Sequence, residues 1–154
     1  MRATTANSSV EAPALLSPAF IAEGCFVHVS GQGPLVNGQY ERGSIDEETR
    51  QTFPNLASVL QNAGSSLERV VRCSAYLADI RDLEAFSTVW EQVFDAPRPA
   101  RTTIQAAALP GGIKVEVACI ALLTPQHREQ LLRTANEVGD RTIDVSIVPD
   151  WTSP

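Results

Sequence analysis

The chain has 154 residues, a formal net charge of −6 and a sequence pI near 4.8. Its 12 lysines and arginines are scattered, which argues against a nucleic-acid partner because such proteins carry a basic patch or stripe. No apolar run is long enough to span a bilayer, so a membrane partner is not expected either.

The cysteines and the first residues indicate a reducing compartment. Cys25, Cys73 and Cys119 each lie in an apolar run and have no metal-ligand spacing. We expect three buried free thiols and no metal or cofactor. The first residues lack the apolar core of a secretory signal, so we expect a cytoplasmic protein. The length of 154 residues predicts one domain of ordinary size.

The first half of the chain predicts strands followed by a helix. Residues 25–32 alternate as a strand that ends in a turn, and Asn37-Gly38 is a strong hairpin signal. A helix begins at Ser44 or Asp46 and ends at Gly64, and Pro54 should kink it or leave one backbone bond unmade. Its apolar stripe is Phe53, Leu56, Leu60 and Ala63.

The next elements predict a strand, a helix and two more strands. Residues 67–79 form a strand with Val71, Cys73, Ala75 and Leu77 on one face, and residues 82–94 form a helix with Leu83, Phe86, Trp90 and Phe94 as its stripe. Two strands, 101–109 and 114–123, are joined by a Pro-Gly-Gly turn. This order predicts an α+β domain with both helices on one face of a mixed sheet. Because residues 115–123 are apolar on both sides, the other face needs a cover, which oligomerisation would supply.

Residues 124–154 are interpreted as a C-terminal extension packed on a domain formed by residues 1–123, whose N-terminal arm is residues 1–13. The extension predicts a helix from Thr124-Pro125 to Gly139, then an edge strand. Trp151 could close a binding cleft as part of a lid, or the extension could pack on the outer helices and only add stability. The apolar stripe of the helix is Leu131, Leu132, Ala135 and Val138.

Arg101 and Glu116 are charged residues in otherwise apolar strands. A two-residue loop at Gly111-Gly112 would keep them about 20 Å apart. A loop from Ala108 to Gly111 would instead place Arg101 opposite Ala118 with Glu116 as a diagonal neighbour, and we expect this second register. The pair is then either a half-buried salt bridge or a functional pair, in which Arg101 holds a small carboxylate and Glu116 orients or deprotonates a water.

Several segments resemble, in order and spacing, the RidA/YjgF family of enamine and imine deaminases. They are "SGQ" at 30–32, "NLASVLQNAGSSLERVVRCSAYLADIRD" at 55–82, "PARTT" at 99–103, "LP" at 109–110 and "VEVACIAL" at 115–122. The resemblance runs from about Gly24 to Leu123. It implies a chorismate-mutase-like α+β fold and a homotrimer whose sites lie in the clefts between subunits.

The resemblance also implies roles for individual residues. Arg101 matches the arginine that grips the substrate carboxylate, Glu116 the glutamate that holds the attacking water, and Gly31 a glycine that lines the pocket. Thr103 stands where the family has a pocket cysteine. "LLSPAF" departs from the family, with Ser17 or Ala19 where a pocket tyrosine is expected.

The sequence and the resemblance together favour hydrolytic deamination of an enamine or imine that carries a carboxylate, which releases ammonia and a 2-oxoacid. No Ser-His-Asp set or phosphate-binding loop is visible, and His28 and His127 are interpreted as structural. One alternative is a trimer that binds a small carboxylate or a partner protein without turnover. Another is a pathway-specific deaminase with a larger substrate, and a ribonuclease is the weakest option given the acidic charge.

Overall fold

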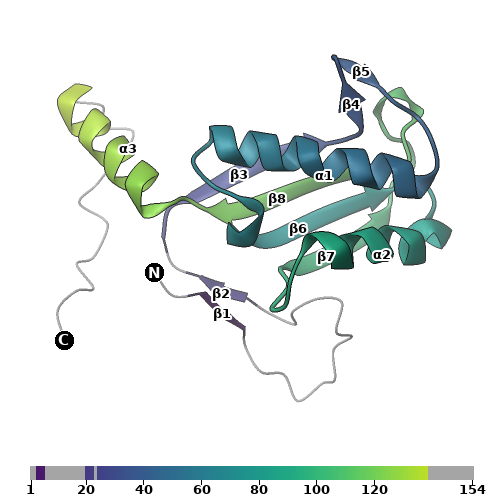
Figure 1. The fold of residues 1–154 in the computed structure, drawn as a ribbon, viewed down its shortest axis with the longest axis horizontal. Helices are drawn as coiled ribbons and strands as arrows, with labels where there is room; N and C mark the ends of the chain where they lie inside the picture. The colour runs from purple at the N-terminus through teal and green to yellow at the C-terminus, as the bar shows by residue number, and fades with distance from the viewer. Residues whose placement is uncertain (1–2, 6–19, 23, 139–154) are drawn as a thin grey trace. The chain divides into compact units, whose positions relative to one another are not determined.

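A computed structural model of the chain describes residues 3–5, 20–22 and 24–138 (Figure 1). The chain divides into two compact units, Met1–Leu123 and Thr124–Pro154. The second unit contains α3 (Pro125–Val138), which begins at the Thr124-Pro125 step that the sequence predicts. The predicted edge strand and Trp151 lie outside the described residues, and the packing of the extension on the domain stays a prediction.

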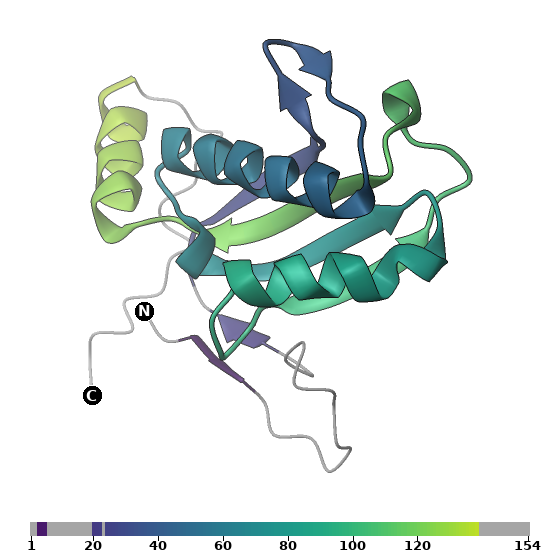
Figure 2. The same cartoon turned by 45° about the vertical axis from the view of Figure 1, so that its right-hand side comes forward.

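The first unit is built on a mixed four-stranded sheet in the order β3-β8-β6-β7. These strands are β3 (Phe26–Gln32), β8 (Val115–Leu122), β6 (Val70–Leu77) and β7 (Ala100–Gln105). Figures 1 and 2 show α1 (Ile45–Asn62) and α2 (Leu83–Val93) on the same face of this sheet. The predicted α+β class, the mixed sheet and the placement of both helices on one face are therefore confirmed.

Two small strand pairs accompany the sheet. The predicted hairpin at Asn37-Gly38 is present as β4 (Leu35–Val36) and β5 (Gln39–Tyr40), and both turn residues have positive φ, 51° and 78°. A pair that the sequence did not predict joins β1 (Ala3–Thr5) to β2 (Phe20–Ala22) in antiparallel register.

The predicted hairpin between the last two strands of the sheet is wrong. β7 is parallel to β6, whereas β8 is antiparallel to β6 on its other side and also pairs with β3. The β6-α2-β7 segment is thus a crossover between parallel strands, a connection that needs a helix-length segment. The Pro-Gly-Gly sequence forms the short turn η3 (Pro110–Gly112) within a longer connection, which carries the chain past the end of β6 to the centre of the sheet.

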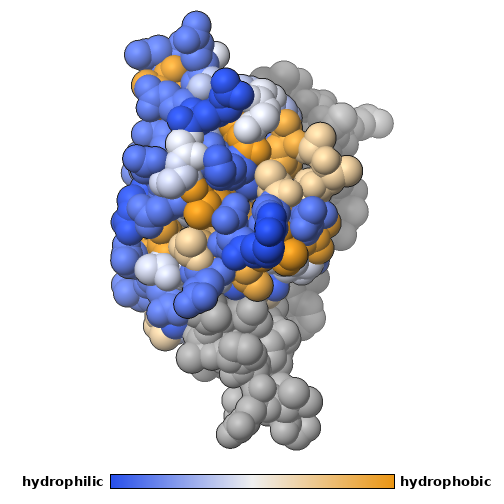
Figure 3. Space-filling model, turned by 90° about the vertical axis from the view of Figure 1, so that its right-hand side faces the viewer, coloured by the Kyte–Doolittle hydropathy of each residue, from blue (hydrophilic) through white to orange (hydrophobic). Residues whose placement is uncertain are grey.

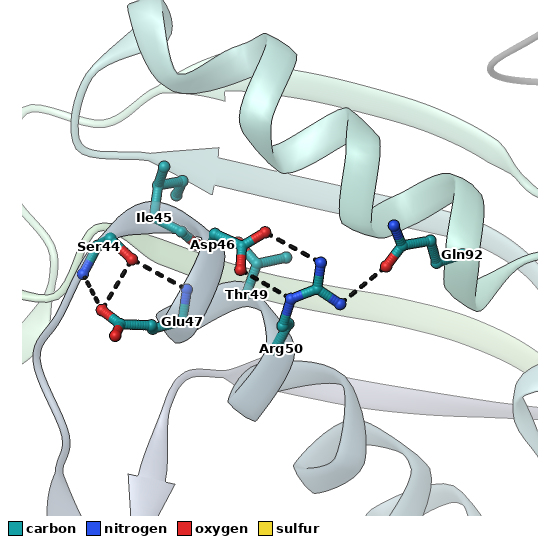
Figure 4. Close-up of polar contacts among 7 residues, drawn as sticks. All are labelled: Ser44, Ile45, Asp46, Glu47, Thr49, Arg50 and Gln92. Carbon is teal, nitrogen blue, oxygen red and sulfur yellow. Dashed lines mark hydrogen bonds and ion pairs between the residues drawn. The ribbon is translucent and has the colours of Figure 1, made fainter.

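Helix α1 begins with a capping box. The Ser44 side chain accepts a hydrogen bond from the backbone N–H of Glu47, and the Glu47 carboxylate accepts one from the backbone N–H of Ser44 (Figure 4). Ser44, the first of the two predicted caps, is therefore the N-cap. Arg50 pairs with Asp46 on the same helix and donates a 2.8 Å hydrogen bond to Gln92 of α2. Pro54 lies within the helix, which continues on both sides of it.

The core lies between the sheet and the two helices. Phe53, Leu56 and Leu60 of α1 and Phe86 and Trp90 of α2 are fully buried, as the stripes predict. The rings of Phe53, Phe86, Trp90 and Phe94 form a contiguous cluster with centroid separations between 4.3 and 6.3 Å. Leu83 departs from its predicted core position, because it remains 37% exposed at the start of α2.

On the face of the sheet opposite α1 and α2, no helix packs among the described residues of the first unit (Figures 1 and 2). Among its side chains, Phe26 is 39% exposed and Ile104 is 49% exposed. Hydrophilic residues cover most of the view in Figure 3, with hydrophobic ones gathered in patches between them. Within the described part of the chain, no helix is both long and apolar enough to cross a membrane.

Candidate active site

Arg101 lies on β7 and extends under α2. Its guanidinium carbon lies 4.9 Å from the ring centroid of Trp90 and 5.3 Å from that of Phe86, and Nη2 donates a 3.1 Å hydrogen bond to Ser87 Oγ. These contacts place the cation over two aromatic faces, which favours positive charge. They also fix the plane of the guanidinium, because the rings restrict it on one side and Ser87 holds one nitrogen.

Two nitrogens of this guanidinium lack acceptors. Nε and Nη1 of Arg101 are buried and have no hydrogen-bond partner among the described residues. Leaving a buried charged donor unpaired is costly, so such groups normally meet an anion or an ordered acceptor. Burial, the largest influence, lowers the pKa of Arg101, whereas Cys73 and Glu91 act in the opposite direction. A carboxylate placed here would supply the missing acceptors in a charge-assisted geometry.

A cleft of about 580 Å³ opens beside Arg101. One face of α2 lines it, because residues three and four positions apart lie on the same side of a helix. The lining includes Glu84, Ser87, Thr88 and Glu91 of α2 together with Arg81 and Arg101. The sequence predicted no role for α2 in this site. The polar residues at 84, 87, 88 and 91 lie opposite the apolar stripe of the helix, and this spacing is the signal that could have identified it.

Thr103 lies two residues beyond Arg101 on the same face of β7. Its register partner on β6 is Ala75, and that of Arg101 is Cys73, both of which are core residues facing the helices. The hydroxyl of Thr103 is buried and also lacks a hydrogen-bond partner within the residues described. The strand therefore presents two polar groups with unused hydrogen-bonding capacity.

Glu116 and Gly31 lie together on the opposite face of the sheet. A Cβ atom on Gly31 would lie 2.1 Å from Oε1 of Glu116, 2.5 Å from Cδ and 2.9 Å from Cγ. The missing side chain of the glycine therefore makes the room that the glutamate occupies. The β3–β8 pairing has an irregular register between Val29 and Gln32, and Gly31 lies within this bulge.

The start of β8 is attached to helix α1 by a buried carboxylate. Glu48 is 1% exposed and accepts hydrogen bonds from the backbone N–H of Lys114, at 2.6 Å, and of Gly43, at 3.0 Å. Lys114 in turn donates through Nζ to the Gly43 carbonyl at 2.7 Å. These bonds fix the backbone two residues before Glu116 and so help to position its side chain.

Arg101 and Glu116 do not meet within one chain, so the expected register, with Arg101 opposite Ala118, is wrong. The alternative register is wrong as well, because both require β7 to pair with β8, which it does not. β6 lies between β7 and β8, and Arg101 is level with Cys73 whereas Glu116 is level with Tyr76. Two strand spacings and three residue steps separate the two backbones by roughly 14 Å. Their side chains also point to opposite faces, because Arg101 packs on α2 while Val115 and Val117, the neighbours of Glu116, face the core. An intrachain salt bridge is therefore excluded.

The two histidines and the positions of the missing tyrosine lie apart from Arg101 or outside the described residues. His28 is exposed on β3 and shares the open face with Glu116, since its partner on β8 is Ile120. His127 lies in the second unit, where its Nδ1 is 3.1 Å from the Thr124 hydroxyl. Ser17 and Ala19, the positions of the missing pocket tyrosine, lie outside the described residues. Among the described residues, no group of three His, Cys, Asp or Glu side chains could hold a metal ion.

The structure thus defines an α+β protein with two separate groups of candidate residues. On one face of the sheet the buried Arg101 lies beside a cleft, and on the other face Glu116 lies against Gly31. The family model described as "Endoribonuclease L-PSP" matches residues 7–123 of this chain. The chain therefore belongs to this family, which is the RidA/YjgF family that the sequence motifs resemble.

Individual relatives agree with this assignment. The mitochondrial protein mmf2 of Schizosaccharomyces pombe is 41% identical over 104 residues, which cover 66% of this chain and 82% of the relative. A 2-iminobutanoate/2-iminopropanoate deaminase of Capra hircus is 36% identical over 123 residues, which cover 77% of this chain and 89% of the relative. The crystal structure of E. coli TdcF with bound serine superposes with a TM-score of 0.61 at 27% identity, covering 68% of this chain and 85% of that one.

Proposed function

We propose that this protein is a hydrolytic deaminase of enamine and imine intermediates that carry a carboxylate, and that its site forms between two copies of the chain. The observation that carries the proposal is the buried guanidinium of Arg101, which lies beside the cleft with Nε and Nη1 unpaired among the described residues. A small substrate carboxylate is the group that this environment accepts best. The goat relative is named as a deaminase of two such imines, and the TdcF crystal structure is of that protein with bound serine, an amino acid.

The need for a second copy follows from the position of Glu116. Because it lies on the face opposite Arg101, a site that uses both residues requires Arg101 from one subunit and Glu116 from another. The sheet face that carries Glu116 also exposes Phe26 and Ile104, which a neighbouring subunit would cover. A homotrimer with the chorismate-mutase-like arrangement, as the sequence resemblance implies, is the assembly we propose.

The chemistry needs little more than positioning. An enamine first tautomerises to the imine, whose carbon is electrophilic. Arg101 fixes the carboxylate, and the Glu116 carboxylate orients a water and accepts its proton as the oxygen adds to the C=N carbon. The nitrogen takes up the proton that Glu116 accepted, the hydroxyl of the resulting adduct loses its proton as the C–N bond breaks and the C=O bond forms, and ammonia and a 2-oxoacid leave. The net reaction consumes one water and releases one ammonia without a change of oxidation state, so it balances without a metal, a redox cofactor or a covalent bond to the protein.

Cys73 and Cys119 do not enter this mechanism. Burial raises the pKa of Cys73 well above its ordinary value and raises that of Cys119 to about 12. Both thiols therefore stay protonated near neutral pH, and a protonated thiol is a poor nucleophile. Their register pairing across β6 and β8, on the core face, makes them packing residues.

The test is hydrolysis of freshly generated 2-iminobutanoate and 2-iminopropanoate, measured as ammonia release above the rate in buffer alone. The proposal predicts acceleration that Arg101→Ala abolishes. Saturable binding of 2-oxobutanoate without any acceleration would instead favour a carboxylate-binding module, and activity only with larger imino acids would favour a pathway-specific enzyme.

A cytoplasmic location also stays a prediction, and the fission yeast relative is named as mitochondrial.

A further inference from the structure

The cleft beside Arg101 has an unbalanced charge distribution. Two carboxylates, Glu84 and Glu91, line it from α2, one at each end of the lining face. Both are exposed, and neither has an ion-pair partner in the described part of the chain. Glu91 is close enough to Arg101 to favour its charged form. The rim of the cleft is therefore acidic while its floor is a cation.

The second arginine of the cleft does not offset these carboxylates. Nε of Arg81 donates to both carboxylate oxygens of Asp79, at 3.0 and 2.8 Å, and Nη2 donates to the same group. The Arg81 hydrogen bonds lower the pKa of Asp79 to about 2, so the pair stays ionised and mutually neutralised near neutral pH. Arg101 is then the cation of the described lining that has no ion-paired carboxylate, although Glu91 is near enough to favour its charge.

A bound substrate changes this balance further. Its carboxylate would neutralise Arg101, as the proposed function requires. The charges that α2 places beside the substrate would then be those of Glu84 and Glu91, in addition to the Glu116 carboxylate that the neighbouring subunit contributes at the reacting carbon. A second carboxylate on the substrate would then face two like charges, whereas a neutral side chain would meet no repulsion and a cationic one would be attracted.

We propose that Glu84 and Glu91 select the substrate by charge, so that the site accepts 2-imino acids with neutral or cationic side chains and discriminates against dicarboxylates. This inference rests on the proposed function. Both glutamates are solvent-exposed, so each contributes a moderate factor, about three- to tenfold in kcat/KM for one charge at roughly 7 Å. Salt should reduce the discrimination, since the screening length at 0.1 M is only about 10 Å.

The experiment compares imino acids prepared from methionine, glutamate and arginine by enzymatic oxidation. Methionine and glutamate have side chains of similar length, so the ratio of kcat/KM for their two imino acids reports mainly the effect of the side-chain charge. The wild type should prefer the methionine and arginine derivatives, and Glu84→Gln/Glu91→Gln should lower the methionine-to-glutamate ratio in kcat/KM by about tenfold or more. The control Glu41→Gln/Glu68→Gln removes two exposed carboxylates of the first unit that do not line the cleft and should leave the ratio unchanged.

Calorimetry measures the same discrimination without turnover, as the ratio of the Kd values for 2-oxoglutarate and for the 2-oxoacid of methionine. Weaker binding of 2-oxoglutarate that the cleft variant alone relieves supports charge selection, even if no imine is hydrolysed. Equal ratios in wild type, cleft variant and control would overturn it, as would a preference of the wild type for the dicarboxylate. Absence of any imine hydrolysis would contradict the proposed function instead.

Discussion

Replacing Gly31 with alanine should remove activity while leaving the fold intact. The added Cβ would lie 2.1 Å from Oε1 of Glu116 and 2.5 Å from its Cδ. Ordinary contact between carbon atoms begins near about 3.5 Å, so the carboxylate must move by roughly 1 Å or more. A misplacement of about 1 Å at a reacting centre can cost on the order of 10²-fold in rate. We therefore expect a loss of that size in kcat.

Stability should change little in this variant. The group that must move is the end of a flexible, half-buried side chain, and alanine in a strand is about 0.5–1 kcal/mol more favourable than glycine. Gly43→Ala is the matched control, because its Cβ would lie 2.6 Å from Oε2 of Glu47, again a flexible carboxylate but one in the capping box of α1. Alanine keeps the backbone N–H and carbonyl through which Gly43 bonds to Glu48 and Lys114, so the variant should cost about 1 kcal/mol of stability or less and leave turnover unchanged.

Imine hydrolysis and thermal unfolding are measured on both variants. On a Glu116→Gln background, Gly31→Ala should cause little further loss, because the group it displaces has already lost its role. Full turnover by Gly31→Ala in the wild-type background would refute the reasoning, since it would mean that the position of the Glu116 carboxylate does not matter. A large drop in melting temperature would show that the clash is relieved by the backbone instead.

Three further outcomes are expected. Arg101→Lys should lose nearly as much kcat/KM as Arg101→Ala, because an ammonium on a flexible stem cannot replace a planar guanidinium; wild-type turnover by the lysine variant would contradict the carboxylate clamp. Glu116→Gln should retain binding of a 2-oxoacid but slow hydrolysis by about 10²-fold or more, and a change in melting temperature alone would favour a structural role. Native Cys73 and Cys119 should resist alkylation at pH 8 and react after unfolding, because burial keeps both thiols protonated; rapid labelling of either thiol in the folded protein, located by mass spectrometry, would be inconsistent with this.

Local patterns were sufficient to predict the helices and strands of the main sheet and the small hairpin, but not the β1–β2 pair. Apolar residues at helical spacing identified both helices and most of their buried faces, Ser44 was among the two caps proposed, and Asn37-Gly38 located the small hairpin. These features depend on residues close in sequence, so their physical causes are visible there. Leu83 was the exception, because its burial depends on what packs against the first turn of α2, which spacing alone does not determine.

Strand pairing could not be predicted in the same way. Residues 101–123 were interpreted as a hairpin because two strands joined by Pro-Gly-Gly are usually neighbours. The pairing of β7 with β6 depends instead on where α2 returns the chain, and β8 occupies the centre of the sheet. The predicted hairpin made Arg101 and Glu116 neighbours, whereas the structure places them on opposite faces of the sheet. The contact of Gly31 with Glu116 and the acidic lining from α2 likewise depend on tertiary structure.

The most direct test of the account is subunit complementation between Arg101→Lys and Glu116→Gln. If each site takes Arg101 from one copy and Glu116 from its neighbour, inactive variants unfolded and refolded together in equal amounts should regain about one quarter of wild-type activity, because one ordered pairing in four is intact in a closed ring. Each variant refolded alone should stay inactive. Recovery of activity in the mixture would support a shared site, and a mixture of assembled hetero-oligomers with no more activity than its parents would contradict it.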